Sequence, residues 1–279
     1  MELLNWVPSN KLAFTMLQMN PNAIDHIEKY HIPKMWTLLS ENPGALCYMY
    51  NDPTMLDNAG YAGWLKNPNP AIIPLLEKYV CIKVPYVQER LLENPNALHL
   101  VDARYIEGNL HLLAKNTSPL AMQLIEDYID VLSNVAWERL SANPSAIHIL
   151  EKNLHKVDWN ILCSNPAAIH LLLKLPYRIY WFQFSKNTHP LAIEHMRKNL
   201  EKVNWENLSA NPAAIELLKE NQDKIAWYWL SQNPAIFEYN YSNMAKAKTN
   251  IIREELVSVA LHPDRVCKWL REGLTLADL

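Results

Sequence analysis

The chain is built from one short motif, Asn-Pro, which recurs along almost its whole length. The pair begins units at Asn20-Pro21, Asn42-Pro43, Asn67-Pro68, Asn94-Pro95, Asn143-Pro144, Asn165-Pro166, Asn211-Pro212 and Asn233-Pro234. Two further units carry a spaced form, "NTSP" at 116–119 and "NTHP" at 187–190. From proline to proline the steps are 22, 25, 27, 24, 25, 22, 24, 22 and 22 residues, so ten units follow one another without a gap. A period of this length is typical of repeat architectures.

The motif is well suited to start a helix. An Asn at the N-cap accepts a backbone N–H bond, and a Pro at the first helical position lacks an N–H that would have no partner there. Small and branched apolar residues follow the proline, as in Ala146, Ile147 and Leu150, and they share one helical face. We therefore expect each unit to open with a helix of roughly two to three turns that ends at pairs such as Glu151-Lys152.

The second half of each unit carries an apolar pair at i, i+3. The first member lies six residues before the capping Asn and is most often tryptophan; these tryptophans, which we expect to form the core of the repeat, are Trp36, Trp137, Trp159, Trp181, Trp205 and Trp227. The second member is usually leucine, as in Leu140 and Leu162. The spacing predicts a short second helix, in part 3₁₀. Since neither helix is stable alone, units must stack on their neighbours.

These patterns predict an all-α fold, an α-solenoid of about ten units of 22–27 residues, each a pair of short helices. With packed helices about 8–10 Å apart, ten layers give a curved rod on the order of 100 Å long. We expect the solenoid to span residues 1–245, with 1–13 as an N-terminal cap. Residues 246–279 are expected to form a C-terminal helical cap, broken at His262-Pro263.

Composition and charge exclude several classes of protein. The chain has 18 Pro, 10 Trp and only 5 Gly, a mix that is poor for hairpins and for nucleotide-binding glycine loops. The net charge of −3 is spread over interleaved acids and bases, so there is no global field to attract nucleic acid or anionic membranes. The four cysteines lie far apart, which argues against a disulfide framework or zinc ribbon and favours a reducing compartment. No secretory signal or membrane span is evident, so we expect an intracellular protein.

Three units, "LSANPSAIHILEKN" (140–153), "LCSNPAAIHLLLK" (162–174) and "LSANPAAIELLKEN" (208–221), resemble the Asn-Pro/Trp tandem repeats of giant DNA viruses of the mimivirus-like group. The ending is similar too, in "NPAIFEYNY" (233–241) and "HPDRVCKWLREG" (262–273). The chain departs from the pattern at 51–66 and 103–113. A bacterial class of Asn-Pro solenoid matches less well. The resemblance implies a helical-repeat fold and a viral origin, and it supplies no catalytic residues to transfer.

One column of the repeat varies in a way that suggests a surface. The fourth position after the proline holds His99, Gln123, His148, His170, Glu194 and Glu216. Two histidines on adjacent layers are too far apart to share one metal ion easily, since each Zn–N bond is only about 2.0–2.1 Å. We therefore predict a variable, solvent-facing column. Cys163 stands where other units have Ser141, Ser209 and Ser231, so we interpret it as a small packing residue rather than a nucleophile.

A second column is basic. Lys156, Arg178, Lys202 and Lys224 each lie three residues before the second-helix tryptophan of their unit. If they project from equivalent loops, they form a row with steps of about 10 Å that could face phosphates or an acidic partner. Asp158, Glu151 and Glu201 lie nearby in sequence, so solvated loop cations are the simpler interpretation.

The sequence holds no catalytic constellation and no metal-ligand pattern, so we expect neither an enzyme nor a cofactor. The function that we predict is a scaffold for macromolecular interaction, with another protein, host or viral, as the partner. One alternative is a structural component of a virion or assembly. A second alternative is nucleic-acid binding through the basic column. If the protein is viral, host cytoplasm, viral factory or virion are its expected locations.

Overall fold

The structure is a computed structural model that describes residues 1–51 and 61–239, together with residues 241, 245, 246, 248, 249, 253, 255, 262, 265 and 268. The chain divides into two compact units, Leu3–Phe237 and Met1–Glu2 with Glu238–Leu279. The unit Leu3–Phe237 holds the repeat array, and the solenoid bound predicted at residue 245 stays a prediction. The predicted C-terminal cap, 246–279, lies outside the described residues except at single positions. At one of them the Thr249 hydroxyl donates a hydrogen bond to the Ala245 carbonyl at 2.8 Å.

The predicted asparagine caps are confirmed in five units, where the repeat asparagine accepts the N–H of the second residue of a 3₁₀ turn that its proline opens: η2 (Pro43–Ala45), η9 (Pro144–Ala146), η10 (Pro166–Ala168), η12 (Pro212–Ala214) and η14 (Pro234–Ile236). In the unit of Asn67 the cap is Asn69, before η4 (Pro70–Ile72), and in the two spaced units Ser118 and His189 cap the helix. The first helices after Asn20 and Asn94 have no side-chain cap. The α-helices of this set are α2 (Ile24–Lys29), α4 (Leu46–Asn51), α6 (Ile73–Tyr79), α9 (Pro119–Asp127), α11 (Ile147–Lys152), α13 (Ile169–Lys174), α15 (Pro190–Arg197) and α17 (Ile215–Glu220). A 3₁₀ turn followed by α11 ends at Lys152, so the predicted length of two to three turns is confirmed.

The second helices are shorter, and most begin at the aromatic position. They are α1 (Phe14–Leu17), α3 (Trp36–Leu39), α5 (Tyr61–Lys66), α7 (Pro85–Leu91), α8 (Leu110–Leu113), α10 (Asn134–Ala142), α12 (Trp159–Leu162), α14 (Trp181–Phe184), α16 (Trp205–Ser209) and α18 (Trp227–Leu230). One short sheet pairs β1 (Glu2–Leu3) with β2 (Phe237–Glu238). The remaining 3₁₀ turns are η1 (Ser9–Lys11), η5 (Leu98–Leu100), η6 (Ala103–Tyr105), η7 (Glu107–Asn109), η8 (Ile129–Val131), η11 (Pro176–Arg178) and η13 (Gln222–Lys224).

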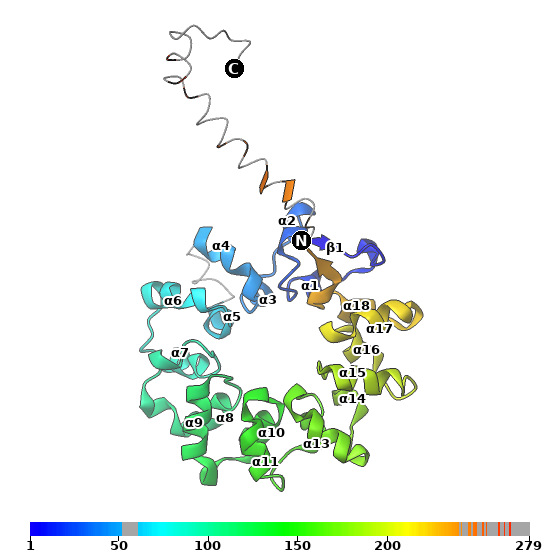
Figure 1. The fold of residues 1–279 in the computed structure, drawn as a ribbon. Helices are drawn as coiled ribbons and strands as arrows, with labels where there is room; N and C mark the ends of the chain where they lie inside the picture. Colours follow the sequence, from blue (N-terminus) through cyan, green and yellow to red (C-terminus); the bar gives the residue numbers. More distant parts are fainter. Residues whose placement is uncertain are drawn as a thin grey trace. The chain divides into compact units, whose positions relative to one another are not determined.

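The two sets of helices form two layers. Figure 1 shows the second helices on the inner side and the first helices on the outer side, most plainly for α3 and α4, α8 and α9, and α10 and α11. The core lies between the layers, because the second member of each i, i+3 pair has no exposed surface: Leu17, Leu39, Trp64, Leu91, Leu113, Leu140, Leu162, Phe184, Leu208 and Leu230. Helices of four residues are held by this packing rather than by their own hydrogen bonds.

The capping asparagines bind the units to one another. Asn165 shows the pattern: its Oδ1 accepts the Ala167 N–H at 3.0 Å, while its Nδ2 donates to the carbonyls of Ser141 (3.1 Å) and Asn143 (3.0 Å) in the preceding unit. Each capping asparagine donates in this way to the preceding asparagine's carbonyl and to a second carbonyl: Asn20, Asn42, Asn67, Asn94, Asn116, Asn143, Asn165, Asn187, Asn211 and Asn233. All ten side chains are buried, so their hydrogen bonds compensate the loss of water.

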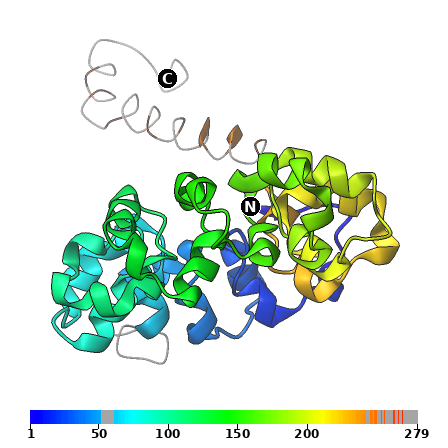
Figure 2. The ribbon, with the colours of Figure 1, turned by 90° about the horizontal axis from the view of Figure 1, so that it is seen from below.

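The asparagine row has no free end. Asn20, in the first unit, donates to the carbonyls of Ser231 (3.1 Å) and Asn233 (2.8 Å) in the last unit. Beside them, the Leu4 N–H donates to the Ile236 carbonyl at 2.9 Å. The blue and yellow ends of this unit meet in both Figure 1 and Figure 2. Leu3–Phe237 is therefore a closed ring of ten helix pairs.

The predicted all-α solenoid of helix pairs is confirmed, but its two ends meet, so the curved rod about 100 Å long is wrong. A stack of units curves through a small rotation at each step, and ten steps of about 36° complete a turn. Within residues 1–13, predicted as an N-terminal cap, Lys11 and Ala13 contact the last unit. The departure predicted at 103–113 is present as two 3₁₀ turns and α8. The departure at 51–66 lies partly outside the described residues, which omit 52–60.

Candidate interaction surface

The basic column predicted from the sequence is present, and each cation lies over the tryptophan of the preceding unit. The distances from Nζ or Cζ to the ring centroid are 5.2 Å for Lys156 over Trp137, 4.6 Å for Arg178 over Trp159, 5.5 Å for Lys202 over Trp181 and 5.0 Å for Lys224 over Trp205. Such contacts are worth about 0.5–1 kcal/mol at exposed sites. The column thus joins neighbouring units, and its use by nucleic acid stays a prediction.

Lys11 extends the same row across the closure, with its Nζ 4.6 Å from the centroid of the Trp227 ring. Lys11 was not among the predicted cations, although it lies three residues before Phe14, at the same offset as the other four. In four units the aromatic position holds no tryptophan, and the position of the cation in the next unit then holds an uncharged or acidic residue. The pairs are Phe14 with Pro33, Tyr61 with Pro85, Gln88 with Glu107 and Leu110 with Asn134. Each cation of the row therefore lies over a tryptophan, and of the six tryptophans only Trp36 lacks a cation at that position in the sequence of the next unit.

The tryptophans predicted as repeat core lie at the junctions, but their burial differs. Trp137 is 3 % exposed, and its indole N–H is buried without a hydrogen-bond partner among the described residues. Trp36, Trp159, Trp181, Trp205 and Trp227 are only half-buried. Trp36 has no following cation and packs edge-on against Tyr48, with centroids 5.6 Å apart. The fully buried core is the leucine column, and most of the tryptophan rings lie half-buried beside it.

Cys163 takes the place of a serine that links units. In a neighbouring unit, Ser141 Oγ donates to the Trp137 carbonyl at 2.8 Å and accepts the Asp158 N–H at 3.0 Å. Cys163 Sγ lies 3.2 Å from the Trp159 carbonyl and accepts the Tyr180 N–H at 3.2 Å. Burial raises the pKa of the Cys163 thiol, which disfavours the thiolate. The interpretation as a small packing residue is supported, and the same link crosses the closure, where Ser231 Oγ accepts the Ala13 N–H at 2.8 Å.

The variable column lies on the outer layer, where all six of its residues are exposed: His99, Gln123, His148, His170, Glu194 and Glu216. His148 Nε2 lies 3.4 Å from Glu126 of α9, and His170 Nε2 lies 2.6 Å from Glu151 of α11. Within α15, Lys198 lies 2.6 Å from Glu194 and lowers the pKa of that carboxyl.

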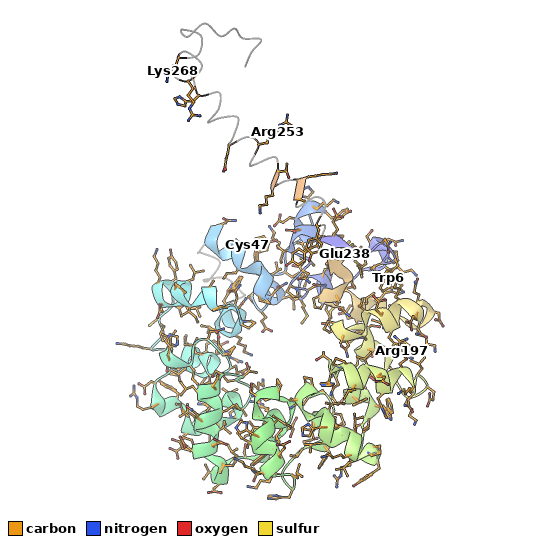
Figure 3. The ribbon with its side chains drawn as sticks, viewed as in Figure 1. Trp6, Cys47, Arg197, Glu238, Arg253 and Lys268 are labelled. Atoms are coloured by element: carbon orange, nitrogen blue, oxygen red, sulfur yellow. The ribbon has the colours of Figure 1, made fainter. Side chains whose placement is uncertain are left out.

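Other outer-layer groups pair in the same way. Arg197 of α15 pairs with Glu220 of α17, and Figure 3 shows Arg197 on the outer side of the ring. Among the described residues, no group of three His, Cys, Asp or Glu side chains is placed to hold a metal ion.

The candidate binding site is a groove on the second helices. It has a volume of about 360 Å³ and crosses α14, α16 and α18, with Phe182 on one wall and Trp229 on the other. Its other lining residues are Lys186, Glu206, Asn207, Ala210, Asn211, Pro212 and Gln232. Phe182 is 55 % exposed and Trp229 is 37 % exposed; Tyr228, beside Trp229, is 51 % exposed. An open groove flanked by uncovered aromatic rings is a surface that another molecule can bury.

The two rings of this groove were not among the predicted site residues, although Phe182 carries a signal. The position after the second-helix tryptophan is polar in most neighbouring units, as in Glu138, Asn160 and Glu206, but it holds Phe182 in α14. Trp229 carries no such signal, because it lies two residues after Trp227.

A second hollow lies where the tryptophan pattern is interrupted. Gln88 replaces the tryptophan and is buried, donating from Nε2 to the carbonyls of Ile82 (2.8 Å) and Leu100 (3.1 Å). The hollow beside it is bordered by Lys83 and by Arg104. Arg104 forks onto Asp102 at 2.7 Å and holds the pKa of that carboxyl at about 2. The Arg104 charge is thus already paired, and the aromatic residue that lines this hollow, Tyr105, is half-buried.

No protein-family model, curated protein or solved structure matches this chain. Among the described residues, no helix has the length and apolar character that crossing a membrane requires. The fold itself defines the class, a closed all-α ring of Asn-Pro repeats.

Proposed function

We propose that this chain is a non-enzymatic interaction scaffold whose partner protein binds the groove across α14, α16 and α18. The observation that carries the proposal is the pair of uncovered rings, Phe182 and Trp229, that face one groove. Aromatic side chains dominate the binding energy of protein interfaces when a partner buries them. An exposed pair of this kind is unfavourable for a protein with no partner.

The ring supports this role by holding the groove in one shape. Asn211 lines the groove, and its side chain donates to the carbonyls of Ser185 and Asn187 in the preceding unit. Asn207 Nδ2 reaches from α16 to the Phe182 carbonyl at 2.7 Å, which fixes two of the three helices relative to each other. A preorganised surface loses little conformational entropy on binding, so more of the contact energy appears as affinity.

The proposed origin is viral, on the strength of the resemblance in the repeat units. A partner is therefore sought in a lysate of infected host cells, with the purified protein immobilised as bait. The test compares the wild type with the double variant Phe182→Ala/Trp229→Ala. The matched control is Tyr177→Ala, which removes a ring that is 78 % exposed in η11, away from the groove.

A partner that is retained by the wild type and by Tyr177→Ala, but lost with the double variant, supports the proposal. Recovery of the same proteins by all three baits contradicts it. Because the substituted side chains are exposed, all three baits should show the same thermal unfolding transition by circular dichroism. That measurement separates a lost contact from a lost fold.

A further inference from the structure

Five consecutive junctions of the ring share one contact, and the junction at Gln88 lacks it. At each of the five, the cation of one unit lies over the tryptophan of the preceding unit, with 4.6–5.5 Å between Nζ or Cζ and the ring centroid. Gln88 occupies the tryptophan position of its unit, six residues before Asn94, and its amide offers no ring for a cation to cover. The chain thus leaves this position of a repeated contact without its aromatic member.

The Gln88 amide is held by backbone groups on both sides of the junction. Its Nε2 donates to the carbonyls of Ile82 (2.8 Å) and Leu100 (3.1 Å), and its Oε1 accepts the Asp102 N–H at 2.6 Å. Both N–H groups of the amide are therefore used. These bonds fix the two segments that border the space beside the amide, which has a volume of about 680 Å³ and which we call the Gln88 hollow.

The junction at Trp137 shows what the same place holds in a unit with tryptophan. The hollow there has a volume of about 500 Å³ and is lined by the start of α10 and by the segment that leads into α12. Trp137 forms part of its wall, and Lys156 lies over the ring at 5.2 Å. The larger Gln88 hollow lies between the corresponding segments, at the start of α7 and before α8, with no ring at the tryptophan position.

The lining of the Gln88 hollow suits an aromatic ring. Three half-buried apolar side chains form its walls: Ile82, Leu100 and Val101. Two exposed cations, Lys83 and Arg104, border it. A hollow of this volume with apolar walls and a few polar groups has the general form of a ligand site. A cation beside an aromatic face is the arrangement that the five other junctions already use.

Other ligands fit these groups less well. A cationic ligand would be repelled by Lys83 and Arg104. An anion would compete with Asp102, which already binds Arg104 at 2.7 Å, and it would lie against apolar walls. An aliphatic side chain would cover the walls but gain nothing from the cations. An aromatic ring uses both, because a guanidinium that is paired at its edge still stacks on a ring through its face.

We propose that the Gln88 hollow binds the tryptophan side chain of a partner protein. The indole ring lies against Ile82, Leu100 and Val101, with Arg104 over its face. The partner thereby supplies to this junction the ring that the chain itself supplies at five others. This inference goes beyond the proposed function, because the Gln88 hollow and the groove across α14, α16 and α18 share no residue.

The test uses the full-length protein and a fluorinated probe, N-acetyl-5-fluorotryptophanamide, whose ¹⁹F NMR signal is distinct from the protein's own tryptophans. We expect the probe signal to broaden and shift in a saturable way at millimolar concentration. Unlabelled N-acetyltryptophanamide should displace the probe, and N-acetylleucinamide at the same concentration should not. Free indole is the third competitor.

Gln88→Trp should abolish binding, because it fills the hollow with a ring of the chain itself. This substitution also removes three hydrogen bonds, so circular dichroism must show that the variant is folded. Arg104→Ala changes a side chain that is 82 % exposed and should weaken binding about two- to fivefold, the strength of an exposed cation–π contact. The matched control is Lys156→Ala, which removes a cation from a junction that has its tryptophan and should bind like the wild type.

Equal displacement by the tryptophan and leucine derivatives, or no binding at millimolar concentration, overturns the inference. So does wild-type affinity in folded Gln88→Trp or in Arg104→Ala. Displacement by free indole but not by N-acetyltryptophanamide would assign the hollow to a small molecule instead of a protein side chain. If binding depends on Phe182 and Trp229 but not on Arg104, the probe lies in the groove, and this inference fails while the proposed function stands.

Discussion

Asparagine is the one side chain that fits each position of the closed row. Its Oδ1 accepts the N–H of the second residue after it, while both hydrogens of Nδ2 donate to the unit before it. Aspartate offers no donor when ionised, and alanine offers neither group. In the middle of the row, Asn165 donates to the buried carbonyl of Ser141, and it shares the carbonyl of Asn143 with the Ala146 N–H.

We expect Asn165→Ala to lower the free energy of unfolding by roughly 2–4 kcal/mol, because it removes a helix cap and two buried hydrogen bonds to the preceding unit. Asn165→Asp should be at least as severe, since its carboxylate would face the same two carbonyls. Urea denaturation measures both. The control is Asn160→Ala, an exposed asparagine on α12, which should change stability by less than about 0.5 kcal/mol. Equal effects at positions 160 and 165 would show that the row does not stabilise the ring.

Replacing Cys163 with serine is expected to change the stability of the ring little. Serine holds the equivalent position in four neighbouring junctions, at Ser141, Ser185, Ser209 and Ser231, where it makes the same two contacts. Cys163→Ser should therefore keep the free energy of unfolding within about 1 kcal/mol of the wild type, while Cys163→Leu should overpack the junction and lose about 1–3 kcal/mol.

The thiol also gives a pH test. Its pKa is raised by burial in the folded state, so the native protein retains that proton more strongly than the unfolded chain. The resulting stability is complete below the unfolded thiol pKa and is lost as pH rises toward the folded value. Urea denaturation above about pH 8.5 should show a decline for the wild type that Cys163→Ser lacks. Parallel pH profiles for the two proteins would contradict this account.

At the scale of the helices, most of the unit could be predicted from the sequence. The asparagine caps, the length of α11 and the buried leucine column follow from local spacing, which acts within one helix or one turn. The hydrogen bonds that Nδ2 donates could not be predicted. Their acceptors are backbone carbonyls of the preceding unit, and a backbone carbonyl has no sequence signature. The contact of Arg178 with Trp159 was missed for a similar reason, since an offset in sequence does not say which ring a cation will reach.

The cation–tryptophan pairs are expected to couple adjacent units weakly but measurably. A double-mutant cycle with Arg178→Met and Trp159→Leu should give a coupling energy of about 0.5–1 kcal/mol. Methionine keeps the apolar stem of the arginine, so the cycle isolates the charge. Lys174→Met, in α13, provides the control pair with Trp159→Leu and should show no coupling within error. A coupling as large for Lys174 as for Arg178 would mean that the effect is general electrostatics rather than the stacked contact.

At the scale of the molecule, the closure is a property that no local pattern encodes. Each junction resembles the next, and only the sum of ten small rotations decides whether the ends meet. Two residues near the N-terminus still indicate the closure. Lys11 and Ala13 lie at the positions that form the internal junctions in the other units. Their contacts with Trp227 and Ser231 repeat those of the internal junctions. The last unit therefore treats the first as its next neighbour.

Deletion of one complete repeat distinguishes the closed ring from an open array. Removing residues 166–187 from the full chain joins Asn165 to Thr188 and leaves every remaining unit intact. In an open solenoid, stability is nearly a sum over units and interfaces, so one internal deletion removes one increment and leaves a shorter monomer. In the ring, nine units with the same rotation leave a gap, and Asn20, Ala13 and Lys11 lose their partners in the last unit. We expect a loss of stability larger than one increment. We also expect dimerisation through the two exposed faces, measured by urea denaturation and sedimentation at several concentrations. A monomer that loses only one increment of stability would contradict this expectation. It would show that the junction between the first and last units contributes little to the free energy of unfolding.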